Sequence, residues 1–403
     1  MSEKAFKNPF RPGAGHMPPY LAGRDEEINE FKRLLEQDVI LENLVLTGLR
    51  GVGKTVLLET LKPHAISSNW LWVGTDLSES SSVSEETMAI RLLADLSAVT
   101  GQLAIHTTER KSIGLKPESI KEATPVNYPY LEAIYRETPG LASDKLKKVL
   151  EFAWDILKGT GKRGIVFAYD EAQNLADHAA SNQFPLSLLL DLFQSLQKKD
   201  IPFMLALTGL PPLFPKLVEA RTFSERMFHI IHIDRLKEAD CRKAITEPTK
   251  KQSCPVHFSD VGVENIILTS GGYPYFIQFI CREAYDIYIQ QVGTGTKPNV
   301  HLGGVIRKLD ADFFEGRWSK ATDRQRELLE LIASMETSDA EFTVAEIVEH
   351  AEKTKSTSQV SQMLSRLCDA GLIYKNRHGK YSFAVPLLGQ FIKRRSGIST
   401  IDL

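Results

Sequence analysis

The chain has 403 residues, of which 42% are hydrophobic and 25% are charged, and its formal net charge is −2. This length leaves room for two or three domains, and the near-neutral charge excludes a global field that would attract nucleic acid or an anionic membrane. No apolar run approaches the roughly 18 residues of a membrane-spanning helix, and the N-terminus lacks an apolar signal-peptide core. Four widely spaced cysteines indicate reduced thiols and favour a cytoplasmic protein.

The first predicted elements form an α/β pattern. Residues 1–22 are rich in proline and glycine and are predicted to be a loop, and Gly23-Arg24-Asp25 begins an amphipathic helix. Short apolar segments separated by helical stretches then predict buried strands, at 43–47, 70–73, 164–169, 202–207 and 228–233. This alternation indicates a parallel sheet covered by helices.

The most informative segment is the phosphate loop, Gly48-Leu-Arg-Gly-Val-Gly53-Lys54-Thr55, which fits the pattern G-x-x-x-x-G-K-[ST]. Its glycines let backbone N–H groups close around phosphate oxygens, and the following helix start adds partial positive charge. We expect Lys54 to reach the β- and γ-phosphates and the Thr55 hydroxyl to bind Mg²⁺. The predicted nucleotide-binding residues of this loop are Gly48, Gly51, Val52, Gly53, Lys54, Thr55 and Val56. The alternative is a glycine-rich turn that matches by chance, which the flanking strand and helix disfavour.

Three expectations concern the segments beyond this loop. The helix over 56–62 is expected to end at Pro63, because proline has no N–H to donate within a helix. Ser82-x-x-Glu85 fits a capping box, which predicts a helix that begins after Ser82. Residues 101–141 are mixed in composition and are interpreted as an insertion without an assigned role.

Acidic and hydroxyl side chains follow the third and fourth predicted strands, over 164–169 and 202–207. Asp170 and Glu171 follow the strand over 164–169, where Asp170 is expected to hold Mg²⁺ and Glu171 to orient and deprotonate the attacking water. The alternative is a pair of acids at a helix N-terminus. Thr208 is expected to contact the γ-phosphate or the attacking water, although it also fits an ordinary strand-end turn.

Two arginines precede the fifth strand. An arginine that one subunit presents to the nucleotide of its neighbour neutralises charge in the transition state of phosphoryl transfer. Arg226 is favoured for this role over Arg221. The alternative for both is a solvated basic residue on a helix.

After residue 233 the strand pattern ends. Residues 235–298 are predicted to be helical, with a turn at Gly271-Gly-Tyr-Pro274. Three capping boxes, which begin at Thr322, Thr343 and Ser356, each predict a short helix, and a hairpin follows them. Three helices and a hairpin indicate a winged helix-turn-helix.

The hairpin and the residues after it carry a local positive charge. Residues 371–397 contain no acidic residue and six basic ones, namely Lys375, Arg377, Lys380, Lys393, Arg394 and Arg395. We expect the third helix to read base edges and the hairpin to contact phosphates. The predicted DNA contacts are Ser358, Gln359, Gln362, Lys375, Arg377 and Lys380. The alternative is a winged helix that contacts protein or acts as a rigid brace.

Together these features resemble an AAA+ ATPase over residues 20–395, in particular the origin-recognition, initiator and transposition-regulator ATPases. The resemblance rests on Gly23-Arg24-Asp25, the phosphate loop, the run Asp170-Glu-Ala-Gln-Asn-Leu175 and the elements after it. It implies a five-stranded sheet in the order 5-1-4-3-2, a helical lid and nucleotide at subunit boundaries. By resemblance, Lys54 and Thr55 are Walker A residues, Asp170 and Glu171 Walker B, Thr208 sensor 1 and Arg226 the trans-acting finger, with Arg24 near the adenine.

One departure concerns the lid. Many AAA+ lids carry a sensor arginine on the helix after a glycine-rich turn, whereas here the first arginine after the turn is Arg282. The turn is similar instead to the Gly-x-Pro of STAND ATPases, which implies that Pro274 packs near the nucleotide. This departure favours a switch that holds nucleotide and hydrolyses it slowly.

The sequence therefore predicts an N-terminal loop over 1–22, an ATPase core over 23–234, a helical lid over 235–300 and a winged-helix domain over 301–403. The predicted function is Mg-dependent ATP binding and hydrolysis that drives an assembly switch and engages DNA. The alternative is a STAND-like signalling or defence ATPase whose winged helix contacts protein. A homo-oligomer and a further protein partner are expected, without a membrane. A chaperone-like remodeller ranks last, because nothing marks a substrate-threading loop.

Overall fold

The computed structural model describes residues 7–111, 118–250, 254–336, 340–352, 354–377 and 379–397. By its internal contacts the chain divides into two compact units. Unit 1 comprises Met1–Arg24, Gly48–Val56 and Ile233–Leu403, and unit 2 comprises Asp25–Thr47 and Leu57–His232. The division into ATPase core, lid and winged helix stays a prediction.

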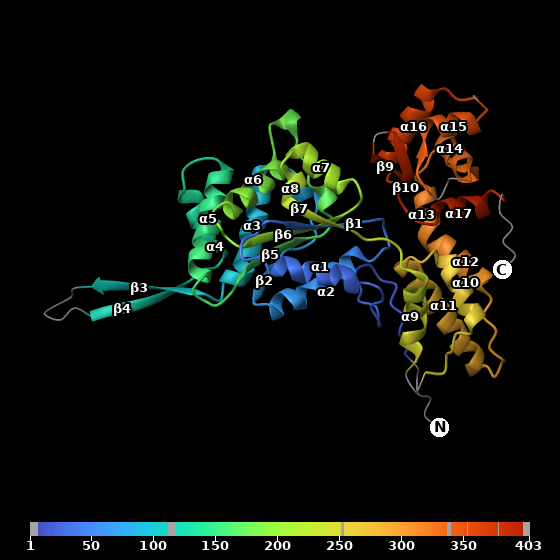
Figure 1. Ribbon diagram of the computed structural model, residues 1–403, viewed down its shortest axis with the longest axis horizontal. Helices are drawn as coiled ribbons and strands as arrows, with labels where there is room; N and C mark the ends of the chain where they lie inside the picture. Colours follow the sequence, from blue (N-terminus) through green and yellow to red (C-terminus); the bar gives the residue numbers. More distant parts are fainter. Residues whose placement is uncertain are drawn as a thin grey trace. The chain divides into compact units, whose positions relative to one another are not determined.

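Unit 2 is built on a parallel sheet of five strands, which confirms the predicted α/β fold (Figure 1). The strands are β1 (Asn43–Thr47), β2 (Trp70–Val73), β5 (Gly164–Tyr169), β6 (Phe203–Gly209) and β7 (Phe228–His232). They lie side by side in the order β2-β5-β6-β1-β7. Strands β3 and β4 form a separate hairpin and do not belong to this sheet. If only the five strands of the sheet are numbered along the chain, their order in space, read from β7, is 5-1-4-3-2.

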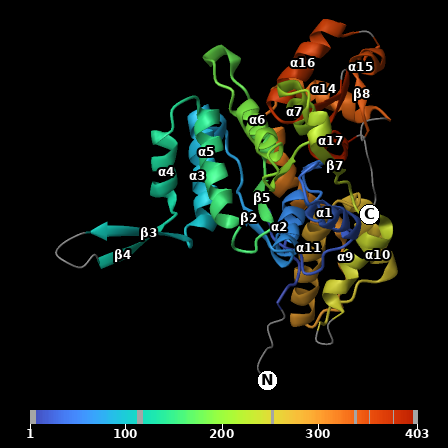
Figure 2. The same ribbon diagram turned by 60° about the vertical axis from the view of Figure 1, so that its left-hand side comes forward.

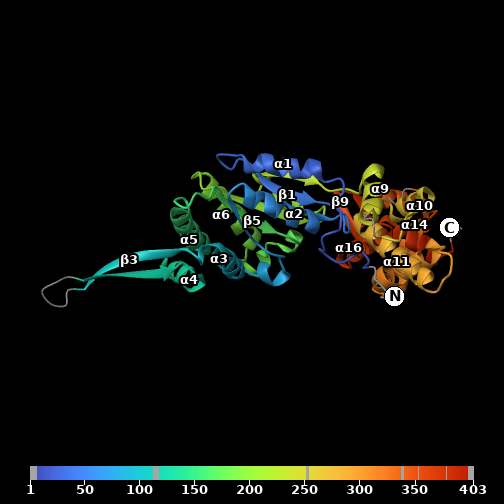
Figure 3. The same cartoon turned by 90° about the horizontal axis from the view of Figure 1, so that it is seen from below.

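Helices cover both faces of the sheet, because successive side chains of a strand point to opposite faces. On β2, the indole N–H of Trp70 donates to the Leu35 carbonyl of α1 (Asp25–Leu35), at 3.1 Å. Leu71 and Val73 point the other way, into the core beneath α3 (Glu85–Thr100), α5 (Ala142–Leu157) and α6 (Pro185–Gln197). Figure 3 shows α1 on one side of the strands and α3 and α5 on the other, and Figure 2 shows α3 beside α5.

Two helix boundaries differ from those predicted. Helix α2 (Lys54–Ser67) continues through Pro63, because the buried Leu61 and Ala65 hold the turns on either side of the proline. Helix α3 is capped by Ser84, whose hydroxyl accepts from the Thr87 amide at 3.1 Å. The predicted cap, Ser82, instead accepts a hydrogen bond from the Ala176 amide at 2.8 Å.

The predicted insertion holds regular structure. Strands β3 (Ala104–Lys111) and β4 (Glu118–Pro125) pair antiparallel, and α4 (Tyr128–Glu137) follows them. Figure 1 shows the hairpin leading away from α4 and α5. The remaining elements of unit 2 are η1 (Glu79–Ser82), η2 (Ala172–Asn174), η3 (Ala179–Ser181), α7 (Leu213–Ala220) and α8 (Ser224–Met227).

Unit 1 begins with the N-terminal segment, whose described part, residues 7–22, is irregular as predicted and packs on a group of helices. The helices are α9 (Glu238–Thr246), η4 (Glu247–Thr249), α10 (Asp260–Ser270), α11 (Pro274–Gly293), α12 (Leu302–Leu309), η5 (Asp310–Phe314) and α13 (Glu315–Trp318). Phe10 is buried among Ile277, Ile280 and Tyr285 of α11. The first segment of the chain is therefore part of this helical core.

The C-terminal elements of unit 1 include the predicted three helices and hairpin. They are α14 (Asp323–Ser334), β8 (Phe342–Thr343), α15 (Val344–His350), α16 (Thr357–Asp369), β9 (Ile373–Arg377), β10 (Lys380–Phe383) and α17 (Leu388–Arg395). All three predicted capping boxes are present, at Thr322, Thr343 and Ser356. The short strand β8, which the sequence did not indicate, pairs with β10 to complete a three-stranded antiparallel sheet.

One buried polar side chain joins three parts of unit 2. The Asn43 carbonyl oxygen accepts from the Leu205 amide and from the Gln197 side chain, both at 2.8 Å. Its NH₂ group donates to the Met227 carbonyl at 3.2 Å. Asn43 is fully buried, so the Leu205 amide and the Met227 carbonyl depend on it for a side-chain partner, whereas the Gln197 amide also donates to the Phe203 carbonyl at 2.8 Å.

We expect Asn43→Ala to lower the free energy of unfolding by about 3 kcal/mol, because it leaves a buried amide and a buried carbonyl unpaired. Urea unfolding followed by circular dichroism measures this change. Gln102→Ala, which removes an exposed amide in the same unit, should stay within about 0.5 kcal/mol of the wild type. Equal midpoints for Asn43→Ala and Gln102→Ala would contradict the role given to Asn43.

Candidate functional site

The phosphate loop adopts a conformation that its glycines make possible. Gly51 and Gly53 have φ angles of 81° and 90°, in the left-handed region that side chains with a Cβ rarely adopt. Gly48 is needed for a different reason, since an added Cβ would lie 2.2 Å from the Ile233 carbonyl oxygen. Helix α2 begins directly after the loop, at Lys54, so the loop leads into a helix N-terminus as predicted.

The Lys54 ammonium group lies over its own loop. Its Nζ donates to the carbonyl oxygens of Gly48 and Leu49, at 3.0 and 2.9 Å. Lys54, Thr55 and Val56 also have interactions beyond these. A lysine cation beside a glycine-rich loop binds phosphate oxygens together with the N–H groups of the loop.

Arg24 braces the loop from inside. Its side chain is buried, and its Nη2 donates to the Val52 carbonyl at 3.0 Å and to the Asp234 carbonyl at 2.7 Å. The guanidinium therefore joins the loop to the segment that follows β7. A place near the adenine, which the resemblance implied for Arg24, stays a prediction.

Two other segments of unit 1 reach the loop. The Tyr275 amide donates to the Gly51 carbonyl at 3.2 Å, which places Pro274, at the first turn of α11, next to the loop. In the N-terminal segment, a Cβ added to Gly15 would lie 3.2 Å from Thr55 Cγ2. No pattern in the sequence indicated that Gly15 lies close to Thr55.

The acidic pair lies at the carboxyl end of β5 in unit 2. Asp170 is 4% exposed, and its backbone pairs with residues 75–77, so its main chain is held in place at the strand end. Glu171 has a φ of 53°, an unusual conformation for a residue with a side chain. Its amide donates to Asp170 Oδ1 at 2.8 Å, a contact that helps to hold this turn.

Gln173 connects Glu171 to the neighbouring strand end. Its NH₂ group donates to a carboxylate oxygen of Glu171, and its carbonyl oxygen accepts from the Leu210 amide at 3.1 Å. Lys216 Nζ donates to the Gln173 backbone carbonyl at 2.9 Å. Gln173 stood in the acidic motif without an assigned role, and the structure shows it as the residue that positions Glu171.

Two threonine hydroxyls lie at the same edge of the sheet. Thr208 is fully buried, and Thr47, which ends β1, is 1% exposed. Within the described part of the chain, neither hydroxyl oxygen has a hydrogen-bond partner. A buried hydroxyl without a partner is costly, so a polar ligand at this edge would offset the cost. Thr47 was missed, although the rule that indicated Thr208, a polar residue at a strand end, applies to it equally.

The two candidate finger arginines differ in their surroundings. Arg221 forms two hydrogen bonds with the Asp191 carboxylate, at 2.8 and 2.7 Å, which raise its pKa. Arg226, on α8, is exposed and has no ion-pair partner among the described residues. Of these two arginines, Arg226 is the one that presents to solvent a charge without an ion-pair partner among the described residues.

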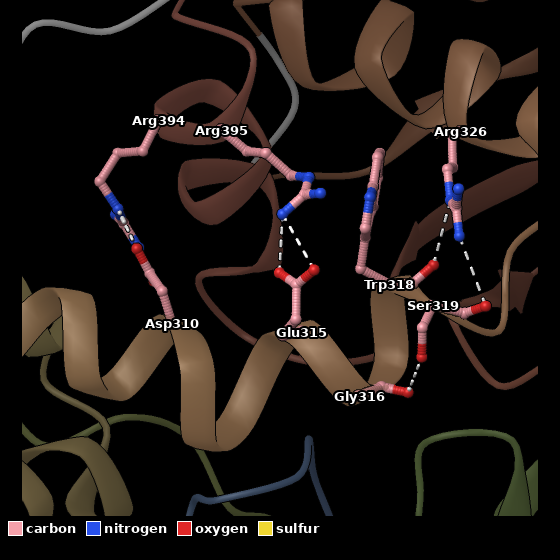
Figure 4. Close-up of polar contacts among 8 residues, drawn as sticks. All are labelled: Asp310, Glu315, Gly316, Trp318, Ser319, Arg326, Arg394 and Arg395. Atoms are coloured by element: carbon pink, nitrogen blue, oxygen red, sulfur yellow. Dashed lines mark hydrogen bonds and ion pairs between the residues drawn. The ribbon is translucent and has the colours of Figure 1, made fainter.

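Part of the predicted basic patch is paired within the chain. Arg394 forms two hydrogen bonds with Asp310, and Arg395 forms two with Glu315, as Figure 4 shows. The Trp318 ring lies between Arg395 and Arg326, as Figure 4 shows. The guanidinium carbon of each arginine is 5.7 Å from the centroid of the Trp318 ring. The sequence count of six positive charges is therefore an overestimate, because two of them are neutralised by carboxylates earlier in the chain.

The predicted DNA contacts occupy the surface of the C-terminal elements. Ser358, Gln359 and Gln362 are exposed on α16, although Gln359 also caps this helix by accepting from the Ser356 amide. Lys375 is exposed and Lys380 is partly exposed. The side chain of Arg377 lies outside the described residues.

The family comparison decides what the phosphate loop belongs to. Residues 20–217 match the family model described as an AAA ATPase domain. The chain carries an AAA ATPase domain. This match includes the phosphate loop, the acidic pair and Thr208, and ends before β7. Residues 311–392 match a second model, described as a domain of unknown function (DUF8462). No curated protein matches the chain in sequence.

Several solved structures are similar to the chain at TM-scores below 0.5. The Aeropyrum pernix ORC1 protein, solved in complex with DNA, is 15% identical with a TM-score of 0.46, over 94% of each chain. The Aeropyrum pernix ORC2 protein, solved as ADPNP–ADP complexes, is 13% identical with a TM-score of 0.47, over 96% of this chain and 98% of that chain. Cdc6p from Pyrobaculum aerophilum is 14% identical with a TM-score of 0.47, over 95% of this chain and 97% of that chain. Similarity at this level carries no functional argument.

The two predicted Mg²⁺ ligands carry the oxygen atoms that this ion prefers. Thr55, in unit 1, has a hydroxyl, and Asp170, in unit 2, has a carboxylate, both hard oxygen ligands. Among the described residues, no three His, Cys, Asp or Glu side chains gather into a metal site of their own. The same part of the chain contains no helix that is long and apolar enough to cross a membrane.

We expect Arg24→Ala to lower the free energy of unfolding by about 2 to 4 kcal/mol in the absence of nucleotide. The substitution removes the donor from the Val52 and Asp234 carbonyls, so the loss does not depend on a ligand. Thermal unfolding of the nucleotide-free protein measures it, with the exposed Arg33→Ala as control. A nucleotide-free stability equal to that of the wild type would show that Arg24 does not brace the loop.

Proposed function

We propose that this protein binds Mg·ATP at the phosphate loop, hydrolyses it slowly, and uses the two nucleotide states as a switch that engages DNA through its C-terminal elements. The observation that carries the proposal is the loop itself. Two glycines in the left-handed region and the Lys54 ammonium over the loop carbonyls form a phosphate cradle at the start of α2. The AAA ATPase domain match supports this assignment.

Each polar group at the site has a proposed part. Lys54 and the loop amides hold the β- and γ-phosphates, and Thr55 and Asp170 hold Mg²⁺, which supplies neutralisation of charge on the phosphates. Thr208 and Thr47 donate their buried hydroxyls to the γ-phosphate or to the attacking water. These donors are fixed before the reaction, so they stabilise developing charge without reorganising.

Glu171 acts as the base that orients and deprotonates the attacking water. Gln173 supports this role, because its amide holds the Glu171 carboxylate while the Leu210 amide holds Gln173. The hydrogen bond also ties up one carboxylate oxygen, which supports slow hydrolysis until a partner alters the contact.

Arg226 is the arginine that one subunit offers to the nucleotide of another. Its charge has no partner among the described residues, whereas Arg221 spends its guanidinium on Asp191. Fast hydrolysis then requires assembly of the protein with its own copies, because the arginine acts in trans.

We expect Glu171→Gln to hydrolyse ATP roughly a hundredfold more slowly or worse, because the amide cannot accept the proton of water. ATP affinity should remain close to that of the wild type, since the phosphate cradle is unchanged. Single-turnover hydrolysis and calorimetry measure the two quantities. Glu225→Gln, an exposed carboxylate on α8, is the matched control, and Lys54→Ala should abolish binding. Wild-type hydrolysis by Glu171→Gln would refute the assignment of the base.

The C-terminal elements carry the features that support engagement of DNA. The exposed Lys375 and partly exposed Lys380 stand at the hairpin, next to the exposed polar residues of α16. A helix with polar side chains beside a basic hairpin fits a base-reading helix flanked by phosphate contacts.

The alternative is a STAND-like signalling or defence switch whose C-terminal elements contact protein. Two observations favour it: Arg394 and Arg395 are paired within the chain, and Pro274 begins α11 beside the phosphate loop. Such a protein would assemble or bind a partner with ATP and show no salt-sensitive affinity for DNA.

We expect Lys375→Glu and Lys380→Glu to weaken DNA binding and to reduce the slope of log affinity against log salt by about 0.9 for each lost phosphate contact. Fluorescence anisotropy over a salt series, with Mg·ATP present, gives both quantities. Lys297→Glu makes the same charge change at an exposed site outside the C-terminal elements and should leave the slope unaltered. Three identical slopes would favour the protein-binding alternative.

A further inference from the structure

The phosphate loop contacts the later part of unit 1 through more than one residue. Leu49 lines a cavity of about 400 Å³ together with Tyr273 from the turn before α11 and Tyr374 from β9. Gly51 accepts the hydrogen bond from Tyr275. In sequence, Arg50 lies between Leu49 and Gly51, and its side chain is exposed.

A chain of ring contacts leads from this loop to Arg317 on α13. The Tyr275 and Phe313 rings lie with their centroids 5.0 Å apart. The Arg317 guanidinium carbon lies 4.2 Å from the centroid of the Phe313 ring, and its Nη1 donates to the Phe313 carbonyl at 2.5 Å. The Arg317 cation is thus held two rings away from the backbone of the loop.

Arg50 and Arg317 are both positively charged, and their charges repel each other. Partial burial, and then the nearby positive charge of Arg50, lower the pKa of Arg317. Among the described residues, neither arginine forms an ion pair with a carboxylate. Arginine keeps its proton under such conditions, so the repulsion and the desolvation remain as an unfavourable term.

Three other arginines in this part of unit 1 each have a carboxylate partner. Arg394 is paired with Asp310 and Arg395 with Glu315, on the helical stretch that also carries Arg317 (Figure 4). Arg326 reaches Asp323 at 3.2 Å. Arg307 and Arg324 also lack a carboxylate partner among the described residues, but both are exposed, whereas Arg317 is partly buried. A partly buried arginine without a carboxylate indicates a site for an anion that is not part of the chain.

We propose that Arg50 and Arg317 form an anion site that receives a phosphate group of the nucleoside triphosphate held by the phosphate loop. The inference rests on the proposed function and deepens it, because it names a contact for the nucleotide on the C-terminal side of unit 1. Guanidinium groups bind phosphate through paired N–H donors, and two of them around one phosphate relieve their mutual repulsion.

The site also gives unit 1 a cation that the start of α11 does not provide. Arg317 lies on the stretch formed by α12, η5 and α13, and the ion pairs of Asp310 and Glu315 fasten this stretch to α17. Loss of a phosphate from the nucleotide would release Arg317 and loosen a segment that is fixed to the C-terminal elements. Nucleotide state would reach those elements through this arginine.

The test measures nucleotide affinity in the full chain by calorimetry with Mg²⁺, using ATP, ADP and AMP. We expect Arg317→Gln and Arg50→Gln each to weaken ATP binding about tenfold, as the loss of a charge-assisted hydrogen bond implies. AMP binding should not change, and the double variant should lose less than the product of the two single effects. Arg307→Gln, an exposed arginine on α12, is the matched control and should bind like the wild type.

The outcomes separate this inference from the proposed function. Wild-type affinity for ATP in both variants overturns the anion site while Lys54→Ala still tests the cradle; absence of ATP binding in the wild type itself overturns both. If the variants keep ATP but lose DNA affinity, the anion is a nucleic-acid phosphate, and if they lose self-association it is a carboxylate of a second copy. Either result also overturns the proposal. Should Arg317→Gln unfold, the exposed Arg50→Gln decides alone.

Discussion

The structure of unit 1 depends on how closely the phosphate loop approaches the segment after β7. The Ile233 carbonyl excludes any Cβ at Gly48, and the Arg24 guanidinium joins the carbonyls of Val52 and Asp234. Both ends of the loop are therefore held by two consecutive residues of that segment. The cradle is set by contacts within the chain, so its shape does not wait for a ligand, which is the condition for strong electrostatic binding.

The same constraint makes the loop a junction. A loop held this tightly transmits the position of the segments beside it. There are three of these among the described residues of unit 1: the N-terminal segment at Gly15, α11 at Tyr275 and the C-terminal elements at Leu49. A change at the phosphates therefore biases contacts made by residues far apart in sequence. This is what a nucleotide switch needs, since a ligand shifts an equilibrium only through contacts that differ between the two states.

What the sequence predicts well is short-range in origin. Five sheet strands lie where buried apolar segments indicated them, and the boxes at Thr322, Thr343 and Ser356 cap their helices, because these signals act within four residues. The phosphate loop was predictable for the same reason. The predicted helix end at Pro63 was wrong because packing around the helix outweighs one lost hydrogen bond. Strand β8 was not predicted because its two residues form a strand only when β10 pairs with them.

Charge is where local reading fails most clearly. The six basic residues near the C-terminus look like one patch in sequence, yet Arg394 and Arg395 are matched by Asp310 and Glu315, about eighty residues earlier. These ion pairs hold α17 against the helical stretch that carries Asp310 and Glu315. Because each arginine is neutralised by a carboxylate, it attracts a DNA phosphate only weakly. Arg50 and Arg317 show the reverse case, because their surroundings in sequence do not indicate that both lack a carboxylate partner among the described residues. A cation that the fold leaves unpaired and half-buried is the one whose partner must come from outside the chain, and its position beside the phosphate cradle favours phosphate.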